Sequence, residues 1–510
     1  MIFAAAMSER RRRTTGRTLS DLVGGLDGMR VLRGGHLPVR RVQLDSRKIT
    51  PGDVFVALRG QHADGVAYLE DARERGASAV VVASGVAAPD RTDLGWVEAD
   101  EPRLAVAMLA ARAWGHPADR LPVIGVTGTN GKTTTVYLLR SIGSVAGRKP
   151  AMIGTLGTSL PAGVSPQART TPEAPDLQAA LSDAVEQGAS MAALEVSSHA
   201  LDLRRVDGMS FAGAAFLNLS PEHLDWHGDM DAYGRSKARL FRELLAPGSG
   251  PGGPRAVINA NDPWADRIRD GVEEVLLFST GGGDGDVTAH GVRSTGSGSA
   301  FCLTTPAGSA DTRIGLPGLH NIENALAAAA LAHGMGISLA DTVRGLEQAE
   351  LPSGRFERVH TGRFDAFVDY AHTPDGLRLA LEVARRIARG RVLVVLGCGG
   401  DRDSSKRPVM GELASTLADV AIFTADNPRN EDPDEIIAQM MGEGCRRERV
   451  EVVPDREEAL LRAVTLADEG DVVLAVGKGH ETVQSVAGID HPFPEREILA
   501  AAAASVDKPQ

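Results

Sequence analysis

A glycine-rich loop near residue 130 carries the clearest chemistry in the sequence. It consists of Gly128, Thr129, Asn130, Gly131, Lys132, Thr133 and Thr134. Successive backbone N–H groups of such a loop can surround a phosphate, and the N-terminus of the following helix adds partial positive charge. Lys132 would reach the terminal phosphates of a nucleotide, and the Thr133 hydroxyl could ligate Mg²⁺. We therefore expect the loop to bind ATP, although Val126 stands where the standard phosphate loop has its first glycine.

The phosphates of ATP and a carboxylate are both negative and repel each other, so a site that holds both needs positive charge. Mg²⁺ suits this task because it binds a few protein oxygens and completes its shell with waters and phosphate oxygens. Thr133 and Glu195 are candidate ligands of a first ion. We expect two magnesium ions in all.

Three polar loops in the last quarter of the chain form a second candidate site. Each follows an apolar stretch that predicts a buried strand, at 392–396, 420–424 and 472–476. Ligands of a parallel sheet bind outside the carboxyl ends of its strands, where these loops would meet. The candidate residues are Arg402, Asp426, Asn427, Arg429, Gly477 and Glu481.

The charges of these loops suit an amino acid. Arg429 can hold a carboxylate through two parallel hydrogen bonds, and Asp426 or Glu481 can meet an ammonium group. Lysine has no second carboxylate and would leave a buried Arg429 unpaired, so an amino acid with two carboxylates is preferred. The alternative interpretation of 426–429 is a simple turn, which Asn-Pro favours.

The elements that position these residues follow an α/β pattern. Short β-branched runs alternate with amphipathic, alanine-rich stretches from residue 42 onward. We expect three domains: an N-terminal α/β domain (1–117), a central domain with the phosphate loop on a parallel sheet (118–350), and a C-terminal Rossmann-like domain (351–510). A hinge is predicted at 351–354.

Three polar or Pro/Gly/Ser-rich segments interrupt the α/β pattern. They lie at 246–254, 280–285 and 294–309. We interpret them as surface loops or hairpin tips, with linkers as the alternative.

Composition narrows the function further. The 510 residues include 55 Lys and Arg against 67 Asp and Glu, a net charge of −12, so we expect no nucleic-acid binding. An uninterrupted run of about 18 apolar residues is absent, so we expect no membrane insertion. The three cysteines are too few for a disulfide framework and fit a reducing cytoplasm. We expect a cytoplasmic monomer with a disordered start at 1–17 and Met1 or Met7 as initiator.

The stretch 126–134 resembles the ATP loop of the Mur ligases and of the folylpolyglutamate synthetases, which form amide bonds through an acyl phosphate. Four further motifs are similar to Mur ligases that add the third residue of the peptidoglycan stem peptide. They are LEVSSH at 194–199, NLSPEHLDWHG at 218–228, DYAHTP at 369–374 and GKGHE at 477–481. The resemblance spans about residues 40 to 500 and follows the family order.

The resemblance implies roles that the residues alone do not assign. It places His223 and a carbamylated Lys237 at the second metal ion, with Lys132, His223 and Lys237 in catalysis. For ATP it implies contacts from His320, Asn321, Asn324, Arg355, Asp369 and His372. For a UDP-linked muramoyl dipeptide it implies Ser46, Thr170, Thr171, Ser197 and Arg205. A helix-capping role for Asn321 is the alternative.

The resemblance also implies a reaction. An ATP-dependent ligase would join diaminopimelate to UDP-MurNAc-L-Ala-D-Glu in peptidoglycan precursor synthesis, because the run Asp-Asn-Pro-Arg at 426–429 resembles the signature of members that add diaminopimelate. Two alternatives remain open: a folylpolyglutamate synthetase-like ligase, and a noncatalytic nucleotide-binding regulator on the same scaffold. The regulator would be expected to lack the charged centre, yet Lys132, Glu195, His223 and Lys237 are all present.

Overall fold

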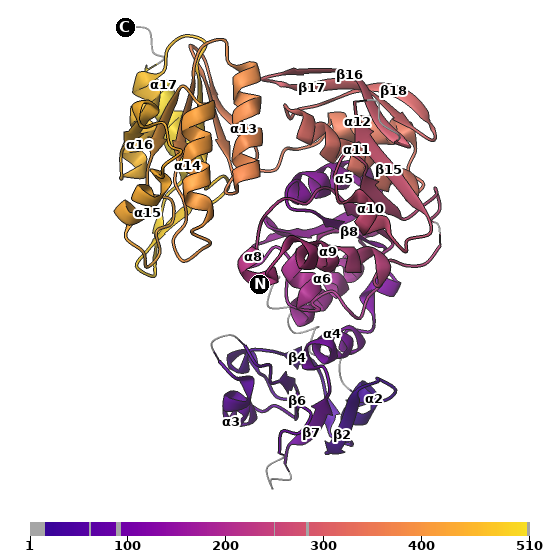
Figure 1. Ribbon diagram of the computed structural model, residues 1–510. Coiled ribbons are helices and arrows are strands. Elements are labelled where there is room, and N and C mark those ends of the chain that lie inside the picture. The colour runs from indigo at the N-terminus through magenta and orange to yellow at the C-terminus, as the bar shows by residue number, and fades with distance from the viewer. Residues whose placement is uncertain (1–15, 61–62, 88–92, 249, 282–284, 507–510) are drawn as a thin grey trace.

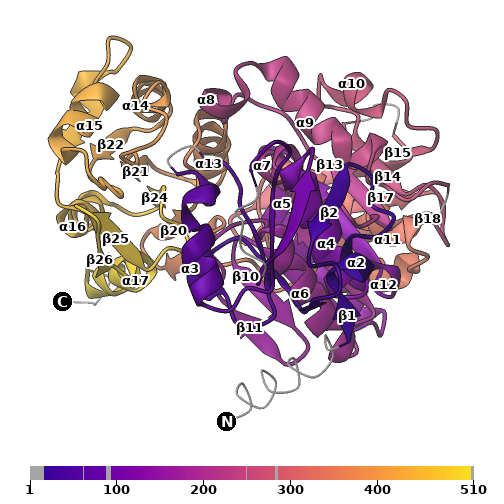
Figure 2. The same cartoon turned by 90° about the horizontal axis from the view of Figure 1, so that it is seen from below.

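The computed structural model of the chain describes residues 16–60, 63–87, 93–248, 250–281 and 285–506. Three main sheets, each with its own helices, follow one another along the chain (Figure 1). The three-domain α/β architecture expected from the sequence is confirmed. Viewed from below, the N-terminal domain lies in front of the central domain, and the C-terminal domain stands to one side (Figure 2).

The N-terminal domain contains a five-stranded sheet in the order β2-β7-β6-β5-β4. Its strands are β2 (Met29–Arg33), β4 (Val42–Gln43), β5 (Val54–Val56), β6 (Ala79–Ala83) and β7 (Gly95–Ala99), and β1 (Arg17–Thr18) pairs with β3 (Pro38–Val39). Its helices are α2 (Leu19–Val23), α3 (Leu69–Glu74), α4 (Pro102–Ala113), η1 (Ser46–Lys48), η2 (Gly65–Tyr68) and η3 (Pro117–Asp119). Because Arg17 lies in β1, the disordered start predicted for 1–17 extends too far, and its first fifteen residues lie outside the described residues.

The central domain is built on an eleven-stranded sheet in the order β11-β10-β9-β12-β8-β13-β14-β15-β16-β17-β18. The strands are β8 (Val123–Thr127), β9 (Pro150–Gly154), β10 (Gly157–Leu160), β11 (Gly163–Ser165), β12 (Met191–Glu195), β13 (Gly213–Phe216), β14 (Ala256–Asn259), β15 (Val275–Thr280), β16 (Val287–Thr295), β17 (Gly298–Thr305) and β18 (Gly308–Ile314). The helices are α5 (Lys132–Val145), α6 (Ala174–Glu186), α7 (Ser198–Asp202), α8 (Leu224–His227), α9 (Met230–Arg242), α10 (Ala265–Arg269), α11 (Leu319–Gly334) and α12 (Leu339–Glu347).

The sheet is parallel only from β9 to β16. Antiparallel strands extend it at both ends, β10 and β11 on one side and β17 and β18 on the other. The parallel sheet expected for the central domain is therefore confirmed in its core, and the antiparallel strands at both edges are an addition to it. Most of 294–309 lies in strands rather than loops, because serine and threonine can face solvent on one side of an antiparallel hairpin; the hairpin tips fall where β16, β17 and β18 connect.

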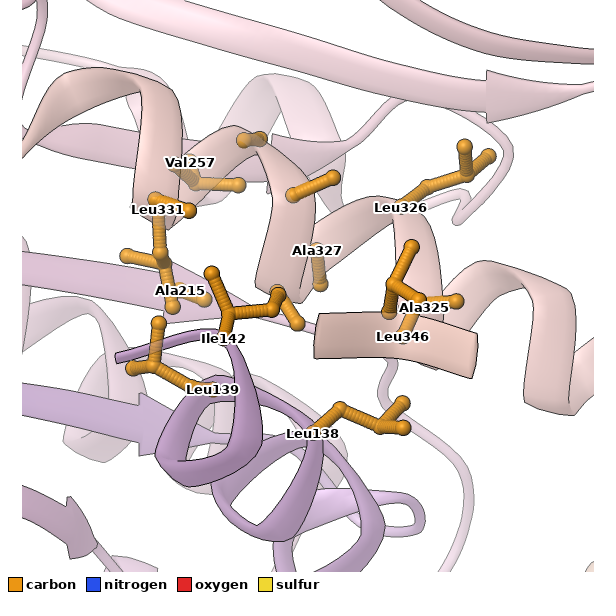
Figure 3. Close-up of a cluster of buried hydrophobic side chains, with 14 of the residues drawn as sticks. Leu138, Leu139, Ile142, Ala215, Val257, Ala325, Leu326, Ala327, Leu331 and Leu346 are labelled. Carbon is orange, nitrogen blue, oxygen red and sulfur yellow. The ribbon is translucent and has the colours of Figure 1, made fainter. Parts of the chain in front are cut away.

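Apolar packing fixes the position of α5, which follows the phosphate loop. Leu138, Leu139 and Ile142 of α5 are fully buried against α11 and α12, where they meet residues such as Leu331 and Leu346 (Figure 3). Burial of each such side chain contributes about 2 kcal/mol. The helix that begins at the loop is therefore anchored along its length.

The C-terminal domain contains a six-stranded sheet in the order β19-β20-β24-β21-β22-β23, parallel except for β19. Its strands are β19 (Glu357–Thr361), β20 (Asp365–Asp369), β21 (Val392–Leu396), β22 (Val420–Phe423), β23 (Val450–Val452) and β24 (Val472–Val476), with a separate hairpin of β25 (Val483–Val486) and β26 (Ile489–Pro492). Its helices are α13 (Pro374–Ile387), α14 (Lys406–Leu417), α15 (Pro433–Met440), η4 (Arg447–Arg449), α16 (Arg456–Leu466) and α17 (Glu495–Val506). The strands predicted at 392–396, 420–424 and 472–476 coincide with β21, β22 and β24 within about a residue.

Candidate active site

The glycine-rich loop connects β8 to α5, between the neighbouring strands β12 and β13. Lys132 Nζ lies 2.8 Å from the carbonyl oxygens of both Gly128 and Thr129, so the lysine folds over the loop. Asn218, from the loop after β13, accepts from the Asn130 N–H (2.9 Å) and donates to its carbonyl (3.2 Å). These two bonds fix the middle of the loop, and Asn218 was not among the site residues predicted from the sequence.

Glu195 is the last residue of β12 and faces the start of α5. Its carboxylate accepts from the Thr133 hydroxyl (2.9 Å), the Thr155 hydroxyl (3.1 Å) and the Thr155 N–H (2.9 Å). Because the carboxyl ends of adjacent parallel strands lie at one edge of the sheet, residues from three separate segments meet here. Thr155 was not among the residues predicted from the sequence.

A polar cluster adjoins the backbone of Glu195. The Thr171 hydroxyl donates to the Glu195 carbonyl (2.8 Å) and accepts from the Ser197 N–H (3.1 Å). Arg205 donates to the Thr171 carbonyl (3.2 Å), and the Thr170 hydroxyl lies 3.0 Å from that of Thr155. Four of the predicted substrate residues are therefore brought together next to the candidate phosphate site.

Ser46, the fifth of these residues, lies in the N-terminal domain. It is buried in η1, and its hydroxyl hydrogen-bonds Asp71 of α3. The described contacts do not connect Ser46 to the cluster at Thr171.

Lys237 is a buried amine that contacts the phosphate loop. Its side chain on α9 is 1% exposed, and Nζ donates to the Gly128 carbonyl (2.9 Å) and lies 4.5 Å from the centre of the Tyr233 ring. Within the part of the chain that the structure describes, no carboxylate forms an ion pair with it. Burial, assisted by the charge of Lys132, lowers the pKa of Lys237 well below that of an ordinary lysine.

His223 and His372 flank one carboxylate, that of Glu222. His223 Nε2 lies 3.7 Å and His372 Nε2 3.4 Å from Glu222 Oε1, so this carboxylate connects the central and C-terminal domains. Burial lowers the pKa of His223 to about 4. Burial alone would raise the pKa of Glu222, but the His372 hydrogen bond and the nearby His223 and Lys132 charges bring it far below its usual range. Glu222 belongs to a quoted motif but was not predicted as a site residue.

A cleft between the central and C-terminal domains adjoins the phosphate loop. One cavity, of about 260 Å³, is lined by residues that include Asn130, Gly131, His320, Asn324 and Arg386. A smaller one beside it, of about 70 Å³, is lined by residues that include Thr134, Asn321, Asp369 and His372. The structure therefore gathers the residues predicted to contact the nucleotide around two adjacent cavities at the loop.

Within this cleft, the Asn321 side chain bonds to the backbone and to the Asn324 side chain. The Asn321 side chain donates to the Pro317 carbonyl (2.8 Å), and that of Asn324 donates to Asn321 Oδ1 (3.2 Å). The capping alternative is wrong for Asn321, because its side chain donates to a carbonyl and so satisfies no free N–H of α11. Burial lowers the pKa of His320 to about 4, so this imidazole is neutral at pH 7.

Arg355 extends from the C-terminal domain to the phosphate loop. Its guanidinium donates to the Thr133 hydroxyl (3.4 Å) and lies 4.8 Å from the centre of the Tyr370 ring. Asp369 accepts from the N–H groups of Phe356 (2.6 Å) and Ala371 (2.7 Å), which holds the backbone beside Arg355. Burial raises the pKa of the Asp369 carboxyl.

The three predicted polar loops of the C-terminal domain do meet at one edge of the sheet. Asn427 donates to Glu481 Oε2 (2.7 Å) and accepts from Lys478 Nζ (2.9 Å). Asp426 lies against Gly477, where an added Cβ would stand 2.3 Å from Asp426 Oδ2. Burial and the neighbouring Asp426 carboxylate raise the pKa of Glu481, so a cationic ligand would be stabilised here. Lys478 was not among the site residues predicted from the sequence.

Two arginines border the same crevice. The Arg429 guanidinium donates to the Gly400 carbonyl (2.6 Å), and its backbone N–H donates to Ser485 (2.9 Å). Arg402 is exposed and lies beside Gly399, which also adjoins Arg429. His480 comes from the same loop as Glu481, and its ring centroid lies 4.9 Å from that of Tyr370. Because Arg355 stacks on the other ring of this pair, Tyr370, a chain of side-chain contacts links the crevice to Arg355.

The described residues contain no group of three or more His, Cys, Asp or Glu side chains arranged to hold a metal ion. Over the same residues, every helix is too short or too polar to cross a bilayer.

Comparison with known proteins covers almost the whole chain. Residues 38–113 match the Mur ligase family catalytic domain, residues 126–332 the Mur ligase middle domain, and residues 354–479 the Mur ligase glutamate ligase domain. The chain is 41% identical over 486 residues to UDP-N-acetylmuramoyl-L-alanyl-D-glutamate--2,6-diaminopimelate ligase of Geobacillus kaustophilus, covering 95% of this chain and 99% of the relative. The enzyme of that name from Chlorobaculum tepidum is 40% identical over 510 residues, covering 97% and 99%.

Solved structures of named proteins have the same fold as this chain. A structure of UDP-N-acetylmuramoyl-L-alanyl-D-glutamate--2,6-diaminopimelate ligase superposes with a TM-score of 0.67 at 32% identity, covering 96% of this chain and 99% of that one. E. coli FolC in complex with DHPP and ADP superposes with a TM-score of 0.57 at 19% identity, covering 79% and 92%, which shows a shared fold alone. With its three domains matched in order and its relatives aligned over nearly their full length, this chain belongs to the Mur ligase family.

Proposed function

We propose that the protein joins diaminopimelate to UDP-MurNAc-L-Ala-D-Glu at the expense of ATP. The γ-phosphoryl group of ATP passes to the D-glutamyl carboxylate, giving an acyl phosphate and ADP. An amine of diaminopimelate then attacks the acyl carbon, phosphate leaves, and the nitrogen loses a proton as the amide forms. ATP and a nucleotide-linked sugar are cytoplasmic metabolites, so we place the reaction there.

The observation that carries this proposal is the sharing of Glu195 between two clusters. Its carboxylate contacts Thr133 of the phosphate loop, while its carbonyl contacts Thr171 of the polar cluster that would hold the dipeptide. A carboxylate bound at that cluster lies beside the terminal phosphates of a nucleotide in the loop. Positioning two reactants in this way removes much of the entropic barrier to phosphoryl transfer.

The donors at the loop suit magnesium. Thr133 and Glu195 supply hard oxygen ligands, and two protein ligands completed by phosphate oxygens and water match the preference of Mg²⁺. Its contribution when bound is to neutralise charge on the phosphates during transfer. We propose Thr133 and Glu195 for one ion and His223 and Lys237 for a second.

Lys237 is chemically suited to become a carbamate. Only a neutral amine adds CO₂, and burial lowers the pKa of this lysine well below its ordinary value. The product would replace a buried neutral amine with an anion close to Lys132, and this anion could hold a metal ion. We propose this modification as the source of the second metal ligand.

The crevice at Asp426, Asn427 and Glu481 would bind the amino acid. Asp426 and Glu481 would meet an ammonium, while Arg429 and Arg402 would meet the distant carboxylate. Arg355 and His372 connect this domain to the phosphate loop and to Glu222, so domain closure brings the amine to the acyl phosphate and excludes water.

A purified-enzyme assay tests the proposal. ADP release is measured with UDP-MurNAc-dipeptide and ATP in the presence of meso-diaminopimelate, LL-diaminopimelate or lysine, and with a folate substrate in place of the dipeptide. We expect turnover with a diaminopimelate isomer, and none with lysine or folate. Turnover with folate would support the polyglutamylating alternative, and ATP binding without phosphate release would support the regulator.

A further inference from the structure

A buried ion pair lies beneath the amino-acid crevice and has no part in the chemistry described above. It joins Arg456, at the start of α16, to Glu495, at the start of α17. Both side chains are 0% exposed, and Arg456 Nε donates to the Glu495 carboxylate. Removing two charges from water is costly, and pairs of this kind often contribute nothing to stability.

The position of Arg456 in its helix is also unfavourable. A cation in the first turn of a helix faces the positive end of the helix dipole, where an acidic residue is preferred. Glu495 at the start of α17 follows that preference, but Arg456 at the start of α16 opposes it. A contact elsewhere must therefore account for an arginine at this site.

The remaining donors of Arg456 supply that contact. One donates to the carbonyl of Val476 (2.8 Å), and another to the carbonyl of Ala425 (3.3 Å). Val476 ends β24 and directly precedes Gly477, while Ala425 follows β22 and directly precedes Asp426. One rigid guanidinium thus spans the two backbone segments that carry the crevice residues.

The separation of these two segments decides whether the crevice can form. Asp426 and Asn427 come from one segment and Glu481 from the other, and Asn427 bonds Glu481 directly across the gap at 2.7 Å. Because β21 lies between β22 and β24, the two segments do not hydrogen-bond each other within the sheet. Arg456 connects the two segments at the ends of the strands through its hydrogen bonds to their carbonyls.

We propose that Arg456 is a positioning residue for amino-acid binding, held by Glu495, which sets the distance between the loops that begin at Asp426 and Gly477. The inference rests on the proposed role of that crevice. Arg456 would then affect the affinity for the amino acid separately from its effect on the stability of the protein.

The test uses the full-length enzyme and four variants. Arg456→Met breaks the pair, whereas Arg456→Met with Glu495→Leu removes both charges and avoids an unpaired buried carboxylate. Arg391→Met is the matched control, because Arg391 pairs with the buried Asp471 at the opposite, amino-terminal ends of β21 and β24. Glu481→Gln tests the crevice itself.

Initial rates of ADP release are measured with diaminopimelate varied at saturating ATP and dipeptide, and then with ATP varied, alongside thermal unfolding. We expect the double variant to raise the KM for diaminopimelate about tenfold or more, since small displacements of binding groups have such effects. Its kcat and KM for ATP should stay within about twofold of the parent. Arg391→Met should lower the unfolding temperature without changing the KM for diaminopimelate.

A normal KM for diaminopimelate in the double variant overturns the inference, as does an equal change in all kinetic constants. If Glu481→Gln also has a normal KM, the proposed crevice is wrong and the inference fails with it. If Glu481→Gln raises the KM while the double variant does not, only the role of Arg456 is refuted.

Discussion

Gly131→Ala should disrupt the phosphate loop by two separable effects. Gly131 precedes α5 with φ of 90°, a backbone conformation that is strained for any residue with a Cβ. An added Cβ would also stand 2.1 Å from Asn324 Oδ1 and 3.1 Å from Leu217 Cδ1. Asn324 lies in α11, whose packing against α5 leaves it little freedom to retreat.

The free-energy cost of Gly131→Ala follows from the backbone conformation and from these contacts. The left-handed conformation costs about 1 to 2 kcal/mol with a Cβ present. Moving Asn324 breaks its hydrogen bonds with Asn321 (3.2 Å) and Thr135 (3.4 Å), together about 1 to 2 kcal/mol. The total is about 3 kcal/mol, and if it falls wholly on the loop, the KM for ATP rises about a hundredfold.

Gly147→Ala provides the matched control at the other end of the same helix. Gly147 also has a positive φ, 75°, but an added Cβ there would meet no atom within 4 Å. This variant should show the strain alone, as a lower unfolding temperature with an unchanged KM for ATP. Initial-rate kinetics and thermal unfolding of both variants give the comparison. If Gly131→Ala matches Gly147→Ala in both measurements, the steric argument is refuted.

Three further predictions concern the proposed site. Arg429→Ala should raise the KM for diaminopimelate about 10- to 100-fold with little change in the KM for ATP, because a charge-assisted contact is lost; steady-state kinetics that show equal losses would instead indicate a folding role. Lys237→Met should lower kcat about a hundredfold, while calorimetry should show that nucleotide binding persists. Intact-protein mass spectra of the parent should show one added CO₂. Activity of the variant equal to that of the parent contradicts the proposal. Stability should fall as pH decreases from about 6.5 to about 4, because the unfolded chain protonates His320 at an ordinary pKa near 6.5 whereas burial holds the folded pKa at about 4. At pH 5.5 this loss is about 1 kcal/mol, and urea unfolding of His320→Gln should show a correspondingly weaker pH dependence; an identical pH profile would argue against a buried neutral imidazole.

The sequence alone determined the α/β class, the strands of the C-terminal domain and the phosphate loop. These features depend on local patterns: apolar runs of strand length, the alternation of strands with amphipathic helices, and glycines followed by lysine and threonine before a helix. The three polar loops after β21, β22 and β24 were likewise predictable, because parallel strands place their carboxyl ends at one edge of a sheet.

Tertiary structure decided which residues complete each site. Asn218, Thr155 and Glu222 contact the predicted residues across large separations in sequence, and asparagine, threonine and glutamate in loops carry no pattern that distinguishes them from solvated residues. The antiparallel edges of the central sheet were missed for a related reason, since polar strands with one solvated face look like loops. Arg456 and Glu495 illustrate the same limit: a charged residue in the first turn of a helix reads as exposed, and only the packing of α16 against α17 buries the pair beneath the crevice.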